Sequence, residues 1–349
     1  MLADFEAQVE AAGQTNQKPF LDCLTENILS ENDLKNLEIK PVKKYLGPIC
    51  AGTIGLIYGP RGVGKTFLRD ALSLCLTRNL DFGPFKSENP AGVLICDGEM
   101  TVNTLKDRHS VLSQNLPEPL RPLDFLSNEY LYRTGNPIVN LNDQLFQNAF
   151  IELIKTRGDR WDVIFFDNLS SLMPGIREND TDAWGPINSF FLKLRWLNKA
   201  VAFVHHAGKS GDQRGASGRE DALDYVLKLA LPAGYDPEAG CRFDASLTKS
   251  RSLIGPEAAP FSFEIINHPS GGLSWTVTNQ RESKKQTIIA LLGNGITQKS
   301  ICEILGVDKA YVSRIRAAAI REKVLSGDGT FTAGGMLKYG SVEIEKYTG

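Results

Sequence analysis

The sequence predicts an α/β fold, in which a doubly wound, mostly parallel sheet is followed by a small all-α domain. Three observations lead to this prediction. A glycine-rich turn joins an apolar run to a helical pattern, short continuous apolar runs alternate with helical patterns, and the C-terminal part is basic and helical. With 349 residues and 42% hydrophobic content, the chain can form one large domain and a smaller one. We expect a lead-in or cap at 1–46, the α/β domain at 47–279, and the helical domain with its tail at 280–349.

Composition excludes several other classes of protein. The six cysteines are scattered without a C-x-x-C pair, which indicates reduced core residues and neither a disulfide nor a zinc framework. Residues 1–10 carry acids and lack a signal-peptide pattern, and no apolar run reaches the length of a membrane span. We therefore expect a cytoplasmic protein without a membrane partner. The net charge of −2 by itself predicts no polyanionic partner.

Residues 1–45 are mostly polar and contain a few short groups of apolar residues. Two interpretations remain open for them. They form either a few helical turns that cap the main domain or a partly disordered lead-in.

The most specific motif is the octapeptide Gly-Pro-Arg-Gly-Val-Gly-Lys-Thr at 59–66, which lies between an apolar run at 53–58 and a helical pattern at 67–74. This strand, turn and helix are the context of a P-loop, whose glycines let backbone N–H groups surround a phosphate. Lys65 would reach the β- and γ-phosphates of ATP, and the Thr66 hydroxyl would bind Mg²⁺. The alternative is a glycine turn without a ligand. The predicted nucleotide-binding residues are Gly59, Pro60, Arg61, Gly62, Val63, Gly64, Lys65, Thr66 and Phe67.

Apolar and helical patterns then alternate along the chain. Helical patterns lie at 101–114, 142–156 and 182–198. Patterns typical of buried or alternating strands lie at 91–97, 129–133, 161–167, 200–206, 224–231, 241–250, 261–267 and 273–278. The last four predict a β-rich end of the same sheet.

Carboxylates at the ends of these strands are candidates for catalysis, because ligands of a doubly wound sheet bind at the carboxyl ends of its strands. Asp167 closes an apolar strand and fits the second Mg²⁺ ligand of a P-loop ATPase, although it could instead cap the next loop. The next residue is Asn168 and not Glu, so the group that activates water must come from elsewhere. We predict Glu99 as the general base with Asp97 as a supporting acid; the alternative is two solvated loop acids.

The Asp97-Gly98-Glu99 sequence resembles the Asp-x-Glu of the RecA-fold ATPases, and the resemblance runs from about Thr53 to Thr278. The segments at 204–209 and 214–218 are most similar to those of the RepA-like hexameric helicases of plasmids and phages. This resemblance implies a RecA-like fold, ATP hydrolysis in a homo-hexamer, and a histidine that senses the γ-phosphate. We expect His206 to be the sensor and His205 to pack in the strand, although their order remains open.

The same resemblance extends to Lys249 and Arg251, which are similar to the Lys-x-Arg pair that reaches the neighbouring subunit's site as an arginine finger does. A solvated basic pair is the alternative. The resemblance also implies channel loops at 170–182 and 207–219 that face single-stranded DNA, although acids in the first loop make its role doubtful. Cations that would contact the DNA phosphates are Lys209, Arg214 and Arg219.

The C-terminal part carries a net positive charge, unlike the rest of the chain. Residues 281–323 contain nine Lys or Arg and four Asp or Glu, a net charge of +5 that leaves −7 on the rest of the chain. Helical patterns at 284–292, 297–305 and 309–321, the last opened by Asp308, look like a resolvase-type or winged helix-turn-helix. Its last helix would present Lys309, Arg314 and Arg316 to a DNA groove. A helical bundle for protein contacts is the alternative, and residues 330–332 form either a small wing or part of a loose tail.

These patterns together lead to one expected function and two alternatives. We expect an ATP-driven ring helicase or translocase that acts on single-stranded DNA during replication of a plasmid, phage or other mobile element. The alternatives are an ATP-gated DNA-binding regulator that unwinds no DNA and a recombinase-like filament former. A P-loop kinase is disfavoured by the basic C-terminal part.

Overall fold

The computed structural model describes residues 20–175, 184–207, 222–340 apart from 233, 237 and 239, and also 342 and 344. The chain divides into two compact units, residues 1–41 and 42–349. In the first unit, helices α2 (Phe20–Glu26) and α3 (Glu31–Asn36) are short. A capping box begins α3, in which Ser30 and Asp33 exchange hydrogen bonds between side chain and backbone. The helical turns expected in this region are therefore present, and their large apolar side chains are exposed.

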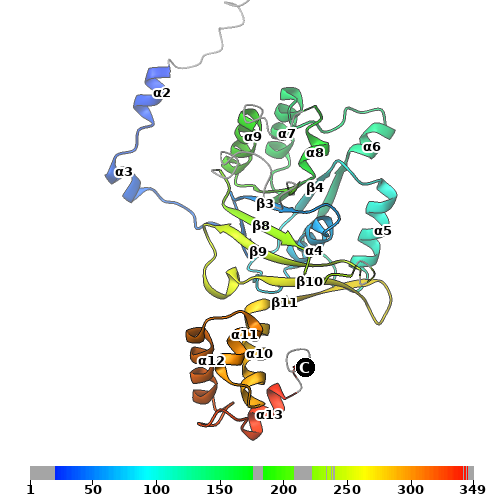
Figure 1. Cartoon of the computed structure of the whole chain (residues 1–349). Helices are drawn as coiled ribbons and strands as arrows, with labels where there is room; N and C mark the ends of the chain where they lie inside the picture. Colours follow the sequence, from blue (N-terminus) through cyan, green and yellow to red (C-terminus); the bar gives the residue numbers. More distant parts are fainter. Residues whose placement is uncertain are drawn as a thin grey trace, which may run out of the picture. The chain divides into compact units, whose positions relative to one another are not determined.

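A nine-stranded sheet forms the centre of the second unit, with the strand order β11-β10-β9-β8-β3-β7-β6-β4-β5 (Figure 1). The strands from β8 to β5 in this order are parallel, whereas β9, β10 and β11 are antiparallel to their neighbours. Their bounds are β3 (Ile54–Gly59), β4 (Val93–Asp97), β5 (Leu123–Ser127), β6 (Val163–Asp167), β7 (Ala200–His206), β8 (Tyr225–Ala230), β9 (Arg242–Ser250), β10 (Phe261–Asn267) and β11 (Leu273–Asn279). The predicted mostly parallel sheet is confirmed.

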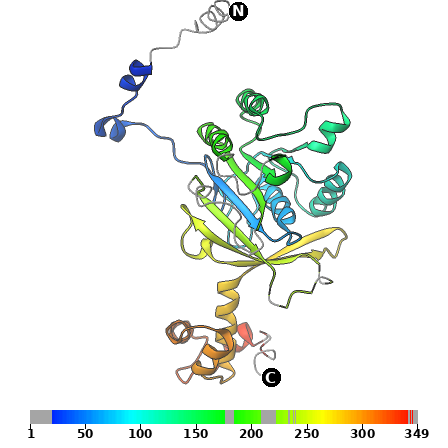
Figure 2. The same cartoon turned by 45° about the horizontal axis from the view of Figure 1, so that its top comes forward.

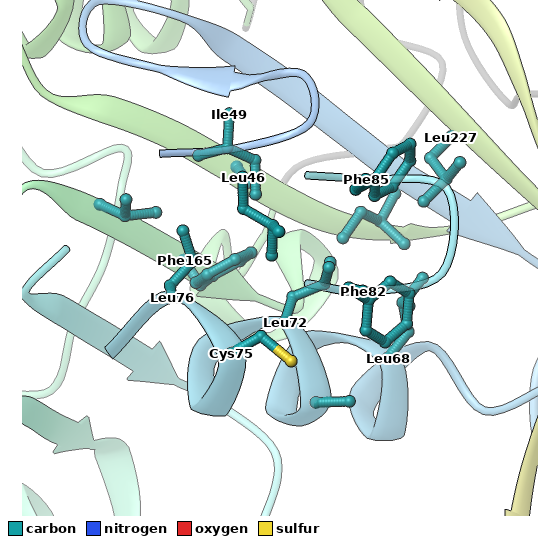
Figure 3. Packing of buried hydrophobic residues seen from close by; sticks show 14 of the residues in the cluster. Leu46, Ile49, Leu68, Leu72, Cys75, Leu76, Phe82, Phe85, Phe165 and Leu227 are labelled. Atoms are coloured by element: carbon teal, nitrogen blue, oxygen red, sulfur yellow. The ribbon is translucent and has the colours of Figure 1, made fainter. Parts of the chain in front are cut away.

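Helices cover both faces of this sheet. On one face, α4 (Lys65–Arg78) packs its apolar side against the sheet and against Phe82 and Phe85, as Figure 3 shows. On the other face, α7 (Gln144–Thr156) and α9 (Trp184–Trp196) bury a second cluster that includes Phe150 and Phe190. The remaining elements of this part are β1 (Lys44–Leu46), β2 (Ile49–Cys50), α5 (Val102–Ser113), α6 (Asn128–Arg133), α8 (Leu169–Leu172) and the 3₁₀ helix η3 (Gly255–Ala258). The fold is therefore doubly wound.

Strand order decides which residues meet at the carboxyl edge of the sheet. Strand β7 lies between β3 and β6, and β4 lies on the far side of β6, which is a RecA-like order. The register places Gly59 beside His206 and Asp97 beside Asp167. Residues far apart in the sequence therefore end at one edge.

One expected element is wrong. Residues 129–133, predicted as a strand, belong to helix α6, and the strand that pairs with β4 is β5. Ser127 accepts a hydrogen bond from the backbone N–H of Tyr130 and so begins the helix. The aromatic residues of 129–133 favoured a strand by propensity, but this cap overrides that weak preference.

The C-terminal part forms a helical body with its own apolar cluster, drawn in orange to red in Figure 2. It contains α10 (Gln280–Gly293), α11 (Gln298–Leu305), α12 (Lys309–Arg321) and α13 (Ala333–Tyr339). Gly306 adopts a left-handed φ of 59° at the turn after α11, and Asp308 caps α12 by accepting from the N–H of Tyr311 at 2.8 Å. A single bridge between Leu325 and Phe331 closes a small hairpin before α13, a helix that the sequence did not predict.

Candidate active site

The P-loop joins β3 to α4 with the backbone geometry that a phosphate cradle requires. Gly62 and Gly64 have φ values of +75° and +106°, which only glycine adopts without strain. A Cβ atom at Gly64 would lie 2.5 Å from the sulfur of Cys241, whereas one at Gly62 would meet no atom within 4 Å. The loop is thus tightly packed at the start of α4 and open at Gly62.

A cavity of about 320 Å³ lies over this loop. It brings the P-loop together with the ends of β4, β6 and β7. Its lining consists of Gly62, Gly64, Lys65, Thr66, Phe67, Asp97, Glu99, Met100, Arg108, Asp167, Asn168 and His206. Three candidates that the sequence placed on different strands, Glu99, Asp167 and His206, therefore face one space.

Lys65 is buried and folds back onto its own loop. Its Nζ donates to the carbonyl oxygens of Gly59 at 3.0 Å and Pro60 at 2.7 Å. Burial lowers the pKa of Lys65 to about 8, although the charges of Asp167 and Glu99 oppose this shift. A phosphate in the cavity would be a stronger partner for this ammonium than the two neutral carbonyl groups.

Thr66 and Asp167 meet beside Lys65 as candidate Mg²⁺ ligands. The Thr66 hydroxyl hydrogen-bonds to the Asp167 carboxylate, and burial raises the pKa of Asp167 to about 6 in spite of the nearby Arg69 guanidinium. Oδ2 of Asp167 forms an ion pair with Nη1 of Arg69 at 2.9 Å but accepts no hydrogen bond from the described residues. A hydroxyl and a carboxylate with a spare lone pair fit Mg²⁺, which takes one or two protein ligands and completes its shell with phosphate oxygens and water.

The part of the chain that the structure describes contains no denser cluster of metal-ligating side chains. Among the described residues, no group of three or more His, Cys, Asp or Glu side chains is arranged to hold a metal ion. Mg²⁺ binding by Thr66 and Asp167 together with nucleotide phosphates stays a prediction.

Asn168 connects the two other polar groups of the cavity. Its Nδ2 donates to Oε2 of Glu99 and lies 3.4 Å from Nε2 of His206. Its Oδ1 accepts from the N–H of Ser171 at 3.1 Å, which begins α8 and fixes the amide. The sequence showed Asn168 only as the absence of a glutamate, so this connecting role was missed.

The two adjacent histidines take different positions at the end of β7. His206 lies beside Gly59 in the sheet and lines the cavity, whereas His205 lies beside Tyr58 and is 3% exposed. The structure thus puts His206 at the position that the predicted sensor needs. Its role as a sensor stays a prediction.

Phe67, which the sequence analysis predicted as a nucleotide-binding residue, forms a second part of the cavity together with Arg108, which the sequence did not reveal. The Arg108 guanidinium lies 4.3 Å from the centre of the Phe67 ring, and one of its nitrogens lies 3.9 Å from the Asp70 carboxylate. Arg108 comes from α5 and Phe67 from α4. A cation stacked on an aromatic ring is a surface on which a nucleic-acid base can also stack.

Lys249 and Arg251 do not join this cavity within their own chain. Strand β9 runs antiparallel to β8, so its last residue, Ser250, lies beside Tyr225 and hence near the start of β3. Arg251 follows directly, and its Nη1 lies 3.4 Å from the Asp224 carboxylate. The pair is therefore at the edge of the sheet opposite to the P-loop, and its predicted action on a neighbouring subunit stays a prediction.

The expected DNA contacts are described only in part. Lys209, Arg214 and Arg219 lie outside the described residues. On α12, Lys309 and Arg314 are exposed. Arg316 is half-buried and donates to the carbonyl oxygen of Gly327 at 2.9 Å, so it supports the hairpin after α12.

No described helix is long and apolar enough to cross a membrane. A family model described as AAA domain matches residues 20–212. No protein among the curated proteins matches the chain. The crystal structure of a KaiC-like protein from the hyperthermophilic archaeon Pyrococcus horikoshii OT3 is similar, with 15% sequence identity and a TM-score of 0.46 over 68% of this chain and 100% of that chain. A likeness at this level supports no conclusion about function.

Proposed function

The chain belongs to the AAA domain family, and we propose that it hydrolyses ATP in the cavity over the P-loop. One observation carries this proposal. A phosphate cradle, a candidate pair of Mg²⁺ ligands and a candidate general base converge on a single cavity from the ends of three different strands, β3, β4 and β6.

Each residue of the cavity has a separate role in the proposed reaction. Lys65 would bind the phosphates, and Thr66 and Asp167 would hold the metal, which would supply positive charge at the phosphate oxygens. Glu99 takes a proton from the attacking water, as a general base does. Asn168 donates to Oε2 of Glu99, which leaves Oε1 without this donor and able to accept the proton. His206, 3.4 Å from the same amide, would respond to the γ-phosphate.

We propose that the nucleoside binds toward Arg108 and Phe67. Both line the cavity, and Arg108 of α5 lies over the ring of Phe67 on the P-loop helix α4. A flat guanidinium on an aromatic ring accepts a base by stacking, without regard to its hydrogen-bonding groups.

For the wider function we propose a ring-forming helicase or translocase on single-stranded DNA. The RecA-like strand order and the exposed Arg251, which is 52% exposed at the edge opposite to its own P-loop, support an assembly in which one chain completes another chain's site. The second candidate is an ATP-gated DNA-binding regulator. The observation that favours it is the short, capped turn between α11 and α12, with Lys309 and Arg314 exposed on the second helix.

Forked DNA with ATP and Mg²⁺ separates these candidates. The helicase predicts unwinding that is lost in Lys65→Ala and in Glu99→Gln but kept in Glu152→Gln, which changes an exposed carboxylate of α7. The regulator predicts ATP hydrolysis that is indifferent to single-stranded DNA, together with duplex binding that responds to nucleotide. Wild-type protein that hydrolyses no ATP under any of these conditions would contradict both.

A further inference from the structure

Arg69 is a buried cation directly beneath the cavity. It lies on α4, one helical turn after Lys65, and its side chain is 0% exposed. A guanidinium removed from water in this way is tolerated only where anions and hydrogen bonds replace its hydration. Three carboxylates surround it, at 2.6 Å from Asp70, 2.8 Å from Asp97 and 2.9 Å from Asp167.

The contact with Asp97 reaches the turn that carries Glu99. One carboxylate oxygen of Asp97 accepts the backbone N–H groups of Glu99 at 3.0 Å and Met100 at 2.7 Å. The other oxygen accepts from Nη1 of Arg69 at 2.8 Å. Both carboxylate oxygens of Asp97 are therefore hydrogen-bonded. Arg69 orients the Asp97 side chain, and Asp97 in turn fixes the backbone of the turn after β4.

The same guanidinium also reaches the end of β6 and its own helix. Nη1 lies 2.9 Å from Oδ2 of Asp167, and Nη2 and Nε both donate to Asp70, at 2.6 and 3.1 Å. Gly98 closes the connection between the two strands by donating its N–H to the carbonyl oxygen of Asp167 at 2.8 Å. One planar group thus joins the P-loop helix to the ends of β4 and β6.

We propose that Arg69 is a positioning residue, which holds the turn of Glu99 and the carboxylate of Asp167 in register with the P-loop. It acts through Asp97 and Asp167 and does not line the cavity. Arginine is suited to this task because its rigid fork of donors serves several carboxylates at once, whereas lysine offers a single charge centre. The part of this inference that concerns catalysis rests on the proposed ATP hydrolysis.

Arg69→Lys is the test variant, because it keeps the charge and removes the fork. Arg78→Lys is the matched control, since Arg78 lies on the same helix, is also buried, and donates to the carbonyl oxygen of Pro117, remote from the cavity. We expect hydrogen exchange at the amides of Glu99 and Met100 to accelerate in Arg69→Lys and to stay at the wild-type rate in Arg78→Lys. Unchanged exchange in Arg69→Lys overturns the proposal.

Steady-state kinetics form the second readout. We expect kcat for ATP hydrolysis to fall by about 10²-fold in Arg69→Lys, the typical effect of misplacing a reacting group by about 1 Å, while the affinity for a fluorescent ATP analogue without Mg²⁺ is unchanged. Loss of nucleotide affinity in proportion to kcat overturns the proposal, because it would make Arg69 a binding residue.

Asp97→Ala tests whether Arg69 acts through Asp97. It also replaces Arg69→Lys as the test variant if Arg69→Lys does not fold. It should accelerate the same amides and lower kcat to a similar extent, and the double variant should lose little more than either single variant. Losses that multiply in the double variant overturn the proposal. Two results could also be found together: the wild-type protein hydrolyses no ATP, and Arg69→Lys still accelerates exchange at the amides of Glu99 and Met100. Together they would refute the proposed hydrolysis and support the positioning of the turn.

Discussion

The substitution Glu99→Gln tests the proposed general base with the least disturbance of the site. The glutamine is isosteric, and its oxygen can still accept the hydrogen bond that Nδ2 of Asn168 donates to Glu99. The amide of Asn168 is itself held by the N–H of Ser171, so it would not turn to follow the change. The substitution therefore removes the proton acceptor and leaves the packing of the cavity intact.

The expected loss follows from the chemistry of proton transfer. A positioned general base contributes about 10²- to 10⁴-fold to a rate, which corresponds to about 3 to 5 kcal/mol of activation free energy. Binding of nucleotide should not weaken, because the substitution removes a negative charge from a cavity that must accept phosphates. We expect kcat to fall by at least 10²-fold while the dissociation constant of a fluorescent ATP analogue stays equal or decreases.

The assay is steady-state ATP hydrolysis with Mg²⁺, accompanied by a fluorescence titration of the same preparations. Glu152→Gln is the control, since Glu152 lies on the outer face of α7, where it pairs with Lys155 at 2.7 Å. A Glu99→Gln protein that retains more than a tenth of the wild-type kcat would refute the assignment of Glu99 as the base. Another group would then have to activate the water.

Four further expectations concern charge, packing, DNA and assembly. Affinity for ATP should fall as the pH rises above about 8, because Lys65 loses its proton there, and titrations of Lys65→Arg should lack this step. Leu72→Ala, in the core under α4, should lower the free energy of unfolding by about 2 to 5 kcal/mol in urea melts, while the exposed Leu21→Ala stays within about 0.5 kcal/mol. Arg314→Ala should reduce the slope of log affinity against log salt for DNA by about 1 without loss of stability. Mixing Arg251→Ala with Lys65→Ala subunits should restore part of the ATPase activity, and a mixture of well-assembled subunits without recovery would contradict action across an interface.

Local sequence patterns were sufficient to predict the central sheet and the edge at which the cavity lies. The sequence pattern that predicts each of these elements extends over only about ten residues. This holds for the P-loop and for the strands that end in Asp97, Asp167 and His206. Because parallel strands end at a common edge, these local signals also predict that their last residues approach one another. This is why Glu99, Asp167 and His206 could be placed in one site without a structure.

The connections inside the site could not be predicted in the same way. The contact of Asn168 with Glu99 and the contact of Arg69 with Asp97 join side chains from different elements, 69 and 28 residues apart. Arg69 on a helix is an ordinary solvated residue until the packing of α4 shows that it is buried. The helix at 128–133 was missed for the opposite reason, since its aromatic residues favour a strand and only the cap by Ser127 decides the outcome.

The balance of charge around the cavity bears on the proposed assembly. Lys65 and Arg108 line the cavity, and Arg69 contacts two of its carboxylates. These three cations are matched in number by the lining carboxylates Asp97, Glu99 and Asp167. The complex of ATP with Mg²⁺ is still an anion, and phosphoryl transfer spreads its negative charge over the oxygens of the γ-phosphate.

A nearly neutral site offers little unpaired positive charge to that transition state, since Arg69 is already committed to three carboxylates and Lys65 is a single ammonium. Among the described residues of the cavity, no further cation is available to the transition state, so we expect an additional one to contribute. Lys249 and Arg251 are basic and lie at the edge of the sheet opposite to their own P-loop, which agrees with the proposal that they act at the cavity of another chain. The charge of the site thus supports the same arrangement as the mixing experiment tests, in which one subunit completes the hydrolytic centre of the next.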